Sequence, residues 1–409
     1  MKILMINHFP LAGSGSGTYT KNLAVHLTEA GHEVCIIFPE NTENYDKIEG
    51  VRMHPVYFTP EDGSPAPEGA LSFNFPCFTT HPRSHETFAG LSEEQFDEYM
   101  LSVKSAIDEE VGAWKPDVVH GQHVWVLPYL AIDTGLPMVV TAHGTDLMGY
   151  DRWPQFRKYA DAVMEYSKAV ISISKDNFLL LEQMLPGYKD KVVMMRNGYD
   201  PSVFYPERLD QYEVLGRHGI TAEEIEYARI ISFAGKLTRF KGVDILLDAM
   251  AIYEDKEPKS LTLIIGDGEE MDSLRKQAAK LGLKTVRFLG NVDQNELRRL
   301  YNAADFNLVP SRREAFGLVA IEAMGCGIPV IATNEGGLPD FVNDEVGALV
   351  NPEDPNDLAR KILEMQARLD RVDVTAWRQE IYEYARNNYA QDKIIGELVE
   401  LYDAICEQS

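Results

Sequence analysis

The sequence has no long apolar run and no excess of positive charge, and each of these absences excludes a class of protein. No apolar stretch approaches the roughly 20 residues that a membrane-spanning helix requires. The formal net charge of −25 argues against nucleic acid as a partner and gives no general attraction to anionic lipid surfaces. A local basic patch is compatible with this balance, so peripheral membrane contact stays open.

Cysteine is also scarce, with four among the 409 residues and no metal-ligand spacing between them. The four are Cys35, Cys77, Cys326 and Cys406. Cys35 and Cys326 lie in apolar contexts that are typical of buried thiols. We therefore expect a reducing, cytoplasmic location and no metal site built on these thiols. Homo-oligomer formation stays open.

A length of 409 residues exceeds what one hydrophobic core usually supports, so two domains are the default expectation. Short β-rich runs alternate with helical segments in both halves of the chain. In the first half these runs are KILMI, EVCIIF, DVVH, PMVVTAH, AVISIS and KVVMM. In the second half they are RIISFAG, LTLIIG, VRFLG, DFNLVP, IPVIAT and GALVNP. This rhythm predicts an α/β protein with two doubly wound parallel sheets, separated near Gly198, Pro201 and Pro206.

The segment 58–91 lacks this rhythm and contains five prolines. Its phenylalanines in the middle and at the end are Phe73, Phe75, Phe78 and Phe88. A long irregular stretch inside a compact domain is usually functional or mobile, so an acceptor loop and a packed surface excursion are both open interpretations. His81 and His85 are four residues apart, but Pro82 between them argues against a zinc-binding helix.

A glycine-rich stretch, GSGSGTYT, follows the first predicted strand and leads into a helix. Gly13, Gly15 and Gly17 let the backbone approach a ligand closely, and a helix start supplies N–H donors. Thr18 stands where a dinucleotide-binding fingerprint needs glycine, and the Gly-Lys-Ser/Thr of a P-loop is absent. Glu40 follows the second strand at about the distance of a ribose-binding acid, so NAD or FAD binding stays a minor alternative.

Two carboxylates, Glu314 and Glu322, stand eight residues apart in PSRREAFGLVAIEAMG. The apolar run from Phe316 to Met324 predicts a helix that is buried on several faces, so the charge of Glu322 needs a partner, such as ribose hydroxyls. The N–H groups of Ala315, Phe316 and Gly317 would hold phosphate oxygens at the helix start. The alternative is that Glu314 caps the helix and Glu322 meets an internal arginine.

This segment resembles the Glu-x7-Glu signature of the retaining glycosyltransferases of family 4, which have the GT-B fold. The resemblance implies two Rossmann-like, doubly wound domains that face an interdomain cleft. It implies an acceptor-binding domain at 1–200, a nucleotide-sugar-binding domain at 201–375, and C-terminal helices at 376–409 that cross back to the first domain.

In the second domain the stretch FAGKLTRFKG resembles the family's phosphate-binding motif, with Lys236 in place of the usual arginine and Lys241 retained. The resemblance implies that both lysines face the diphosphate, that Glu314 positions the sugar hydroxyls and that Glu322 holds the ribose. It implies further donor contacts at Gly235, Gly266, Gly268, Leu289, Ala315, Phe316, Gly317 and Leu318.

In the first domain the family carries a histidine that contacts the donor sugar, and its usual pattern is His-x-His. Here DVVHGQHVW offers His123, which we favour, and His120 as the alternative. The resemblance implies that Gly15 and Gly17 approach the donor. It implies acceptor contacts at Ser16, Thr18, His143, Asp146 and Asn197. For Asp146 a turn-forming role is an equal alternative.

We therefore expect a retaining glycosyltransferase that moves a sugar from a UDP- or GDP-sugar to an acceptor hydroxyl, with no metal or other cofactor. The partners would be the nucleotide sugar and a hydroxyl-bearing acceptor. Two alternatives stay open, namely a nucleotide-sugar epimerase of the same architecture and a sugar-nucleotide-binding protein that has lost catalysis.

Overall fold

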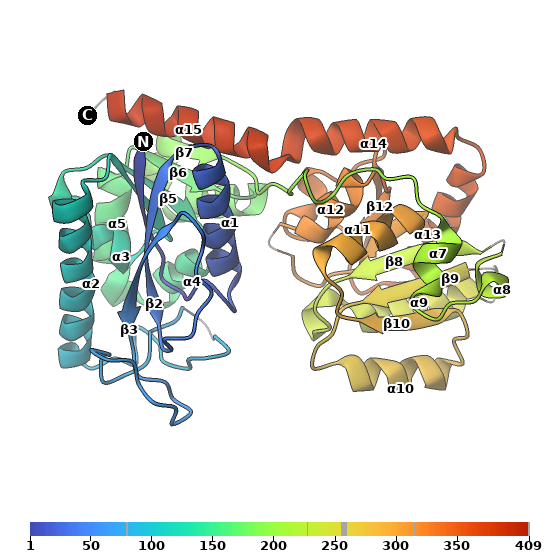
Figure 1. Cartoon of the computed structure of the whole chain (residues 1–409), viewed down its shortest axis with the longest axis horizontal. Coiled ribbons are helices and arrows are strands. Elements are labelled where there is room, and N and C mark those ends of the chain that lie inside the picture. The colour runs from blue at the N-terminus through green and yellow to red at the C-terminus, as the bar shows by residue number, and fades with distance from the viewer. Residues whose placement is uncertain (79–80, 227, 255–259, 315, 408–409) are drawn as a thin grey trace. The chain divides into compact units, whose positions relative to one another are not determined.

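The chain forms two compact units, each with its own parallel sheet. The structure is a computed structural model that describes residues 1–78, 81–226, 228–254, 260–314 and 316–407. The first unit comprises Met1–Arg196 and Ile394–Ser409, and the second comprises Asn197–Lys393. The chain therefore passes from one unit to the other twice, and its last helix belongs mainly to the unit that contains the N-terminus (Figure 1).

The first unit has a seven-stranded parallel sheet of order β3-β2-β1-β4-β5-β6-β7. Its strands are β1 (Lys2–Ile6), β2 (Glu33–Glu40), β3 (Arg52–Tyr57), β4 (Val118–Gln122), β5 (Met138–Ala142), β6 (Ala169–Ser172) and β7 (Val192–Met194). Its helices are α1 (Gly15–Glu29), α2 (Glu93–Trp114), α3 (Val126–Leu130), α4 (Thr145–Arg152), α5 (Arg157–Tyr166), α6 (Lys175–Met184) and α15 (Gln391–Glu407).

Alternating side chains of β1 serve two different cores, as expected for a strand that is covered on both faces. Ile3 and Met5 pack with apolar residues of α1 and α15. Leu4 and Ile6 pack on the other side with α2, α3 and α5 and with the segment 58–91. Figure 1 shows α2 and α5 on one side of these strands and α1 on the other.

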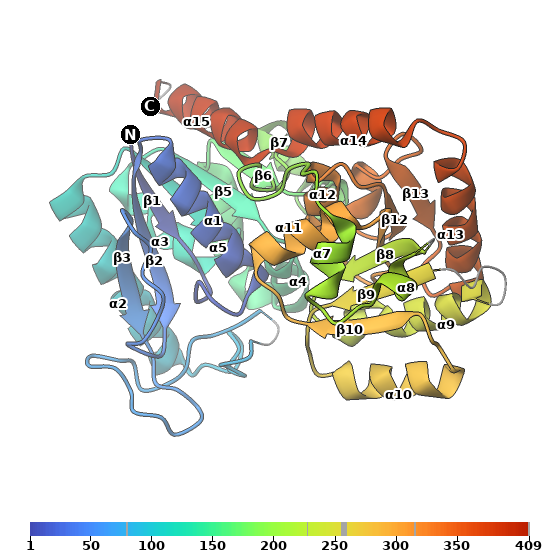
Figure 2. The same cartoon turned by 45° about the vertical axis from the view of Figure 1, so that its right-hand side comes forward.

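The second unit has a six-stranded parallel sheet of order β10-β9-β8-β11-β12-β13. Its strands are β8 (Arg229–Ala234), β9 (Ser260–Ile265), β10 (Val286–Gly290), β11 (Phe306–Val309), β12 (Val330–Thr333) and β13 (Gly347–Val350). Its helices are α7 (Gln211–Gly216), α8 (Ala222–Ile225), α9 (Val243–Glu254), α10 (Met271–Leu281), α11 (Gln294–Ala303), α12 (Leu318–Gly325), α13 (Pro355–Leu369) and α14 (Val374–Tyr389). Helix α9 packs against α10 and α13, whereas α12 packs against α11 and α14 (Figure 2).

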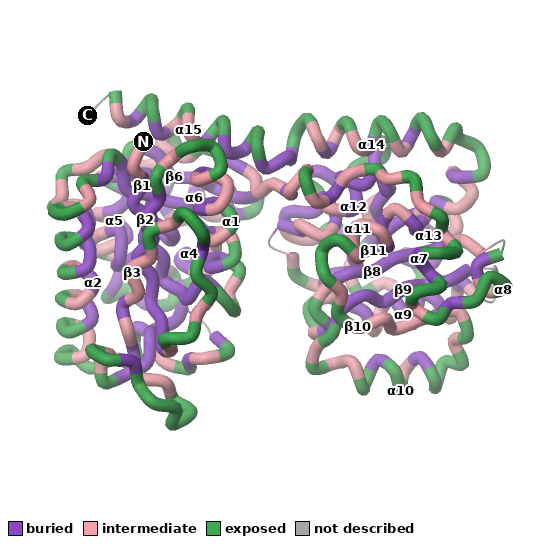
Figure 3. The backbone as a smooth tube through the Cα atoms, in the orientation of Figure 1, coloured by how far each residue is buried: buried purple, intermediate pink, exposed green. Residues whose placement is uncertain are grey.

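Burial follows the two sheets, with the central strands buried on both faces and the sheet edges more exposed (Figure 3). The edge strand β3 is only partly buried and contains Pro55, which has no N–H for a sheet hydrogen bond. In the part of the chain with described coordinates, no helix is long and apolar enough to cross a membrane.

Each sheet has a point at which the strand order reverses, between β1 and β4 in the first unit and between β8 and β11 in the second. Loops that leave the two central strands there diverge to opposite faces, and in open α/β sheets the ligand-binding crevice lies at this point of the carboxyl edge. In the first unit these are the loops that follow Ile6 and Gln122. In the second unit they follow Ala234 and Val309. Several of the predicted site residues lie in these four loops, among them His123, Lys236, Lys241 and Glu314.

The last helix is fixed to the first sheet by a buried hydrogen bond between Tyr402 Oη and His120 Nδ1, at 2.6 Å. Tyr402→Phe should lower the free energy of unfolding by about 1–3 kcal/mol, because it leaves a buried ring nitrogen without its partner. Urea unfolding followed by tryptophan fluorescence measures this loss. Tyr212→Phe removes the same atom from a side chain that is 49% exposed and serves as the control. Equal losses in the two variants would show that the buried bond contributes nothing.

Candidate functional site

The two loops at the order reversal of the second sheet are joined by close backbone packing. Gly242 has φ 67°, and a Cβ atom there would lie 2.0 Å from the carbonyl oxygen of Pro310. Arg312 donates its backbone N–H to the Phe240 carbonyl at 2.7 Å and both Nη groups to Asp244 at 2.7 Å. This bidentate ion pair holds the loop after β11 against the first turn of α9, which follows the loop after β8.

Two of the predicted catalytic residues meet at this junction. Lys241 Nζ lies 2.6 Å from Glu314 Oε2, and Ser311 Oγ donates to the same oxygen at 3.1 Å. Lys236, at the other end of the loop, is exposed and has no ion-pair partner among residues with described coordinates. Two cations at the ends of one short loop suit a diphosphate, because each can neutralise part of its charge.

The predicted glycines shape the same loop. A Cβ atom on Gly266, which has φ 131°, would lie 2.0 Å from the Gly235 carbonyl oxygen, and one on Gly268 would lie 2.4 Å from that of Leu237. These two positions therefore hold the backbone on either side of Lys236. Leu289 lies in the neighbouring strand β10, whose last residue accepts the Gly266 N–H.

Helix α12 begins at Leu318, so the prediction that the helix includes Phe316 was wrong. The cause is Gly317, whose φ of 99° is incompatible with a continuous helix and makes it the N-cap residue. The Phe316 side chain is buried and packs on Phe341 with ring centroids 5.5 Å apart. The free N–H groups of the first turn thus start at Leu318. Ala315 lies outside the described residues.

The Glu322 side chain, in α12, has no hydrogen-bond or ion-pair partner among the described residues, so the alternative of an internal arginine partner receives no support. Burial raises the pKa of its carboxyl to about 7. A carboxylate in this setting gains most from hydroxyl donors supplied by a ligand.

Gly336 is a site residue that the sequence prediction missed. It has φ 56°, and a Cβ atom there would lie 1.6 Å from the carbonyl oxygen of Glu314. The neighbouring Gly337 donates its N–H to the same carbonyl at 3.2 Å. The backbone of Glu314 is therefore fixed by a glycine pair that is 22 residues further along the chain. Only the folded structure reveals that pairing.

In the first unit His123 occupies the order reversal with a strained backbone, since its φ of 85° is unusual for a non-glycine residue. The side chain is fully buried, and Nδ1 donates to the Gln122 carbonyl at 2.7 Å. Burial lowers the pKa of the ring to about 3, so the ring is neutral at pH 7. Nε2 then carries a lone pair and has no hydrogen-bond partner among the described residues. This nitrogen can accept a hydrogen bond from a hydroxyl group.

Other histidines surround His123. The rings of His143 and His8 have centroids 4.7 and 5.5 Å from that of His123. His143 Nε2 lies 2.9 Å from Gln122 Oε1, and burial lowers the pKa of His143 to about 3. His8 was not predicted, because a single histidine after a strand carries no signal until the sheet places it beside His123.

The side chain of Asp146 fixes the backbone next to this histidine cluster. Its two carboxylate oxygens accept the N–H groups of Val124 at 2.8 Å and His143 at 3.2 Å. His120, the alternative to His123, has both ring nitrogens bonded within the unit, one to Tyr402 and the other to Thr141 at 2.8 Å. Among the described residues, His123 therefore has a ring nitrogen without a hydrogen bond, whereas both ring nitrogens of His120 are used inside the unit.

The glycine-rich stretch forms the start of α1, with Ser14 as the N-cap whose Oγ accepts the Gly17 N–H at 3.0 Å. A Cβ atom on Gly17 would lie 2.1 Å from the Pro10 carbonyl oxygen, whereas Gly15 faces open space. Gly17 thus serves packing and Gly15 leaves room for a ligand. Ser16 is buried, and Thr18 is exposed.

Two further predicted residues lie apart from this crevice. Glu40 is buried and forms an ion pair with Arg83, which leaves it unsuited to bind a cofactor ribose. Asn197 is the first residue of the second unit. The following Gly198 packs on the Gln391 backbone, where a Cβ atom would lie 2.8 Å from Cα.

Sequence relatives identify the family. The model of the glycosyl transferases group 1 matches residues 222–386, and that of glycosyltransferase family 4 matches residues 13–203. A D-inositol 3-phosphate glycosyltransferase of Corynebacterium jeikeium is 31% identical over 300 residues, which cover 66% of this chain and 70% of the relative. The chain belongs to the group 1 glycosyltransferases.

Another relative and a solved structure match more of the chain. Glycogen synthase of Mycobacterium tuberculosis is 28% identical over 385 residues, with 88% of this chain and 85% of the relative covered. The structure of Anabaena HepE in complex with UDP has a TM-score of 0.73 at 19% identity and covers 99% of this chain and all of that chain. The predicted GT-B fold with two Rossmann-like units is confirmed.

Gly336→Ala should reduce sugar transfer about 100-fold while the protein stays folded, because the added Cβ displaces the Glu314 backbone. The rate of nucleoside diphosphate release from a nucleotide sugar, with circular dichroism as the folding check, measures this. Gly282→Ala is the matched control, since Gly282 has φ 72° but open space around it. An unchanged rate in Gly336→Ala would remove the positioning role.

Binding of UDP or GDP should strengthen as the pH rises from 6 to 8, because the Glu322 carboxyl ionises near pH 7 and only the carboxylate accepts two ribose hydroxyls. Calorimetric titration across this range measures the affinity. Glu322→Gln keeps the shape but cannot ionise, so any pH dependence left in that variant comes from other groups of the protein or from the nucleotide. Identical pH profiles for the two proteins would contradict the assignment.

Proposed function

We propose that this glycosyltransferase is a retaining, metal-independent enzyme that moves a sugar from a UDP- or GDP-sugar to an acceptor hydroxyl. The second unit would bind the donor and the first the acceptor. The observation that carries the proposal is the junction of the two loops in the second unit, where Lys241 and Glu314 meet and the exposed Lys236 lies at the other end of the loop after β8.

The lysines act on the leaving group. When the anomeric C–O bond breaks, negative charge develops on the departing diphosphate, and Lys236, Lys241 and the N–H groups at the start of α12 stabilise it. Lys236 supplies charge without the planar fork of the arginine that the family usually has. Glu314 positions the sugar hydroxyls and Glu322 holds the ribose.

The neutral ring of His123 supports a binding role for this residue over an acid–base role. Its free Nε2 lone pair would accept a hydroxyl of the sugar. The acceptor oxygen attacks the anomeric carbon from the side of the leaving oxygen, which takes the acceptor proton, so the anomeric configuration is retained. No covalent nucleophile is assigned.

The similar proteins support the donor class more than the acceptor. HepE is bound to UDP, which favours a uridine donor. The relatives include one that acts on inositol 3-phosphate and one that makes glycogen, so anionic and neutral acceptors are both represented in the family. On the cysteine usage of the sequence we also propose a cytoplasmic location.

The test is to incubate the protein with a panel of UDP- and GDP-sugars and a mixture of hydroxyl acceptors, with and without EDTA, and to determine the product anomer by NMR. We expect transfer with retention that EDTA does not change. An inverted product or dependence on a metal would overturn the respective part of the proposal. A rearranged free sugar would identify an epimerase, and binding without turnover a binding protein.

A matched pair of variants ties this activity to the proposed site. Lys241→Ala should weaken nucleoside diphosphate binding by about tenfold or more, because a charge-assisted contact is lost. Lys280→Ala removes an exposed lysine from the end of α10 in the same unit and should bind as the wild type does. Equal affinities would remove Lys241 from the site.

A further inference from the structure

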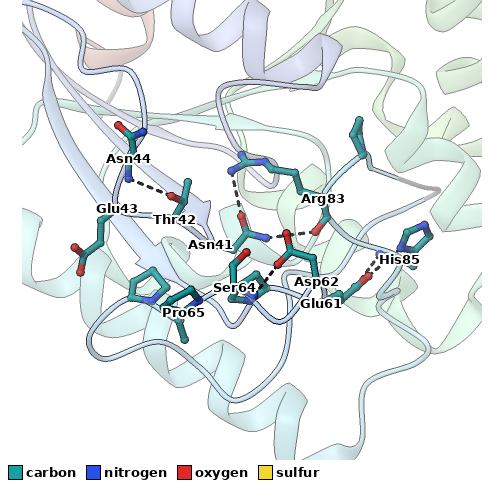
Figure 4. Close-up of a pocket in the computed structure, with 14 residues that line it drawn as sticks. Asn41, Thr42, Glu43, Asn44, Glu61, Asp62, Ser64, Pro65, Arg83 and His85 are labelled. Carbon is teal, nitrogen blue, oxygen red and sulfur yellow. Dashed lines mark hydrogen bonds and ion pairs between the residues drawn. The ribbon is translucent and has the colours of Figure 1, made fainter. Parts of the chain in front are cut away.

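The first unit contains a polar pocket that none of the assigned site residues lines. Its volume is about 890 Å³, which lies within the range of small-molecule sites. Three chain segments line it: 41–44 after β2, 60–67 after β3, and 82–85 (Figure 4). Both strands end at the carboxyl edge of the sheet, the edge that also carries His123. The irregular segment 58–91 therefore builds most of the pocket.

One wall of the pocket is held rigidly by Arg83. Its guanidinium pairs with the buried Glu40 and donates to Asn41 Oδ1 at 3.1 Å. The Arg83 carbonyl accepts side-chain N–H groups of Asn74 at 2.6 Å and Asn41 at 3.3 Å. The charge of Arg83 is thus already compensated by a carboxylate from β2.

The pocket is also lined by carboxylates. Glu61 accepts the His85 backbone N–H at 2.8 Å, and its other oxygen lies 2.9 Å from His85 Nδ1. Although partial burial opposes it, the contacts with His85 and Ser84 lower the pKa of Glu61. The bond from Ser64 lowers the pKa of Asp62, which is exposed at the rim. Both groups are carboxylates at neutral pH.

The balance of charge disfavours an anionic ligand. Glu43, Glu61 and Asp62 line the pocket, and Arg83 is neutralised by Glu40. A smaller cavity of about 140 Å³ shares Arg83 with the pocket, and its lysine, Lys21, pairs with Asp46 at 3.3 Å. A phosphate group brought here would meet carboxylates without an uncompensated lysine or arginine among the described lining residues.

Hydroxyl groups match the lining better. Each hydroxyl both donates and accepts a hydrogen bond, and the pocket offers acceptors on Asp62 and Glu43 and mixed amide and hydroxyl groups on Asn44 and Ser64. Pro65 and other proline rings add apolar C–H surface between these polar groups (Figure 4). This mixture suits a carbohydrate, which alternates hydroxyl groups with C–H faces.

The pocket is linked by packing to the loops at the order reversal. The smaller cavity reaches Leu11 and Ala12, which precede the glycine-rich stretch. A Cβ atom on Gly13 would lie 3.0 Å from the His81 ring, and that ring stacks on Phe9 at 6.0 Å. Phe9 in turn contacts His123, with ring centroids 5.5 Å apart. A ligand in the pocket thus lies on the segment that packs against the proposed acceptor loops.

We propose that this pocket holds the part of the acceptor remote from the reacting hydroxyl, and that it selects a neutral, hydroxyl-rich acceptor over a phosphorylated one. The identification of the ligand as an acceptor rests on the proposed function. The binding of a neutral carbohydrate in this pocket does not depend on that function. Within the family it places this enzyme with those that extend uncharged carbohydrates.

The experiment measures direct binding to the full chain by saturation-transfer NMR and titration, without donor. The probes are trehalose, maltotriose and myo-inositol, together with trehalose 6-phosphate and myo-inositol 3-phosphate. We expect at least one neutral probe to bind about tenfold or more tightly than its phosphate ester. Tighter binding of the esters, or no binding of any neutral probe, would overturn the proposal.

Three variants test whether the carbohydrate probes bind in this pocket. Asp62→Asn keeps the turn to Ser64 but removes the charge, and should lessen the discrimination against the esters. Asp62→Lys should reverse it. Glu68→Gln changes an exposed acid of the same segment that does not line the pocket, and should leave both affinities unchanged. If Asp62→Lys leaves the preference intact, the pocket is not the site.

Donor turnover separates this proposal from the proposed function. Binding of a neutral probe without any release of nucleoside diphosphate would contradict the enzymatic role and leave the carbohydrate site standing. If only the phosphate esters stimulate donor turnover, sugar transfer is established. The proposed selectivity of the pocket for neutral acceptors is then wrong.

Discussion

The parallel direction of the strands is the constraint on which both halves of this molecule depend. Because all strands of a sheet run the same way, every loop that leaves a strand end emerges at one edge, and the reversal of strand order opens a crevice there. In the first unit this edge gathers His8, His123 and the start of α1. In the second it gathers Lys236, Lys241 and Glu314. Hydrogen bonding of the sheets thus brings together chemical groups from distant parts of the chain.

The candidate site residues of the two units differ in charge. In the first unit, burial makes the histidines neutral, so that they act through lone pairs and N–H groups rather than through charge. In the second unit the cations are at or near the surface, and carboxylates limit their field. In a protein with a net charge of −25, this loop carries both Lys236 and Lys241. Under the proposed function, these two cations would face the diphosphate.

The sequence predicted the features that are set by local pattern. The central strands are buried on both faces and so have continuous apolar runs, and they were found with small errors at the ends. Strand β3 was missed because it lies at an edge, is half-buried and contains Pro55. The start of α12 was misplaced because apolar Phe316 looks helical until the positive φ of Gly317 is known.

Tertiary pairing was beyond the reach of sequence reasoning. The family resemblance named Lys241 and Glu314, but the contact between them and the support from Gly336 depend on loops that are far apart in the chain. The same holds for the pocket of the first unit. In the sequence its carboxylates are indistinguishable from other acidic loop residues. Only the fold brings segments 41–44, 60–67 and 82–85 together.

The ion pair between Lys241 and Glu314 has a consequence for the order of events at the donor site. Under the proposed function, a diphosphate that binds Lys241 would compete with Glu314 for the same ammonium group, and its arrival would free the carboxylate for the sugar. A free sugar has no anion with which to displace Glu314 and meets a carboxylate that is already engaged. Under the proposed function, the pair would therefore favour ligands that carry a diphosphate over free sugars.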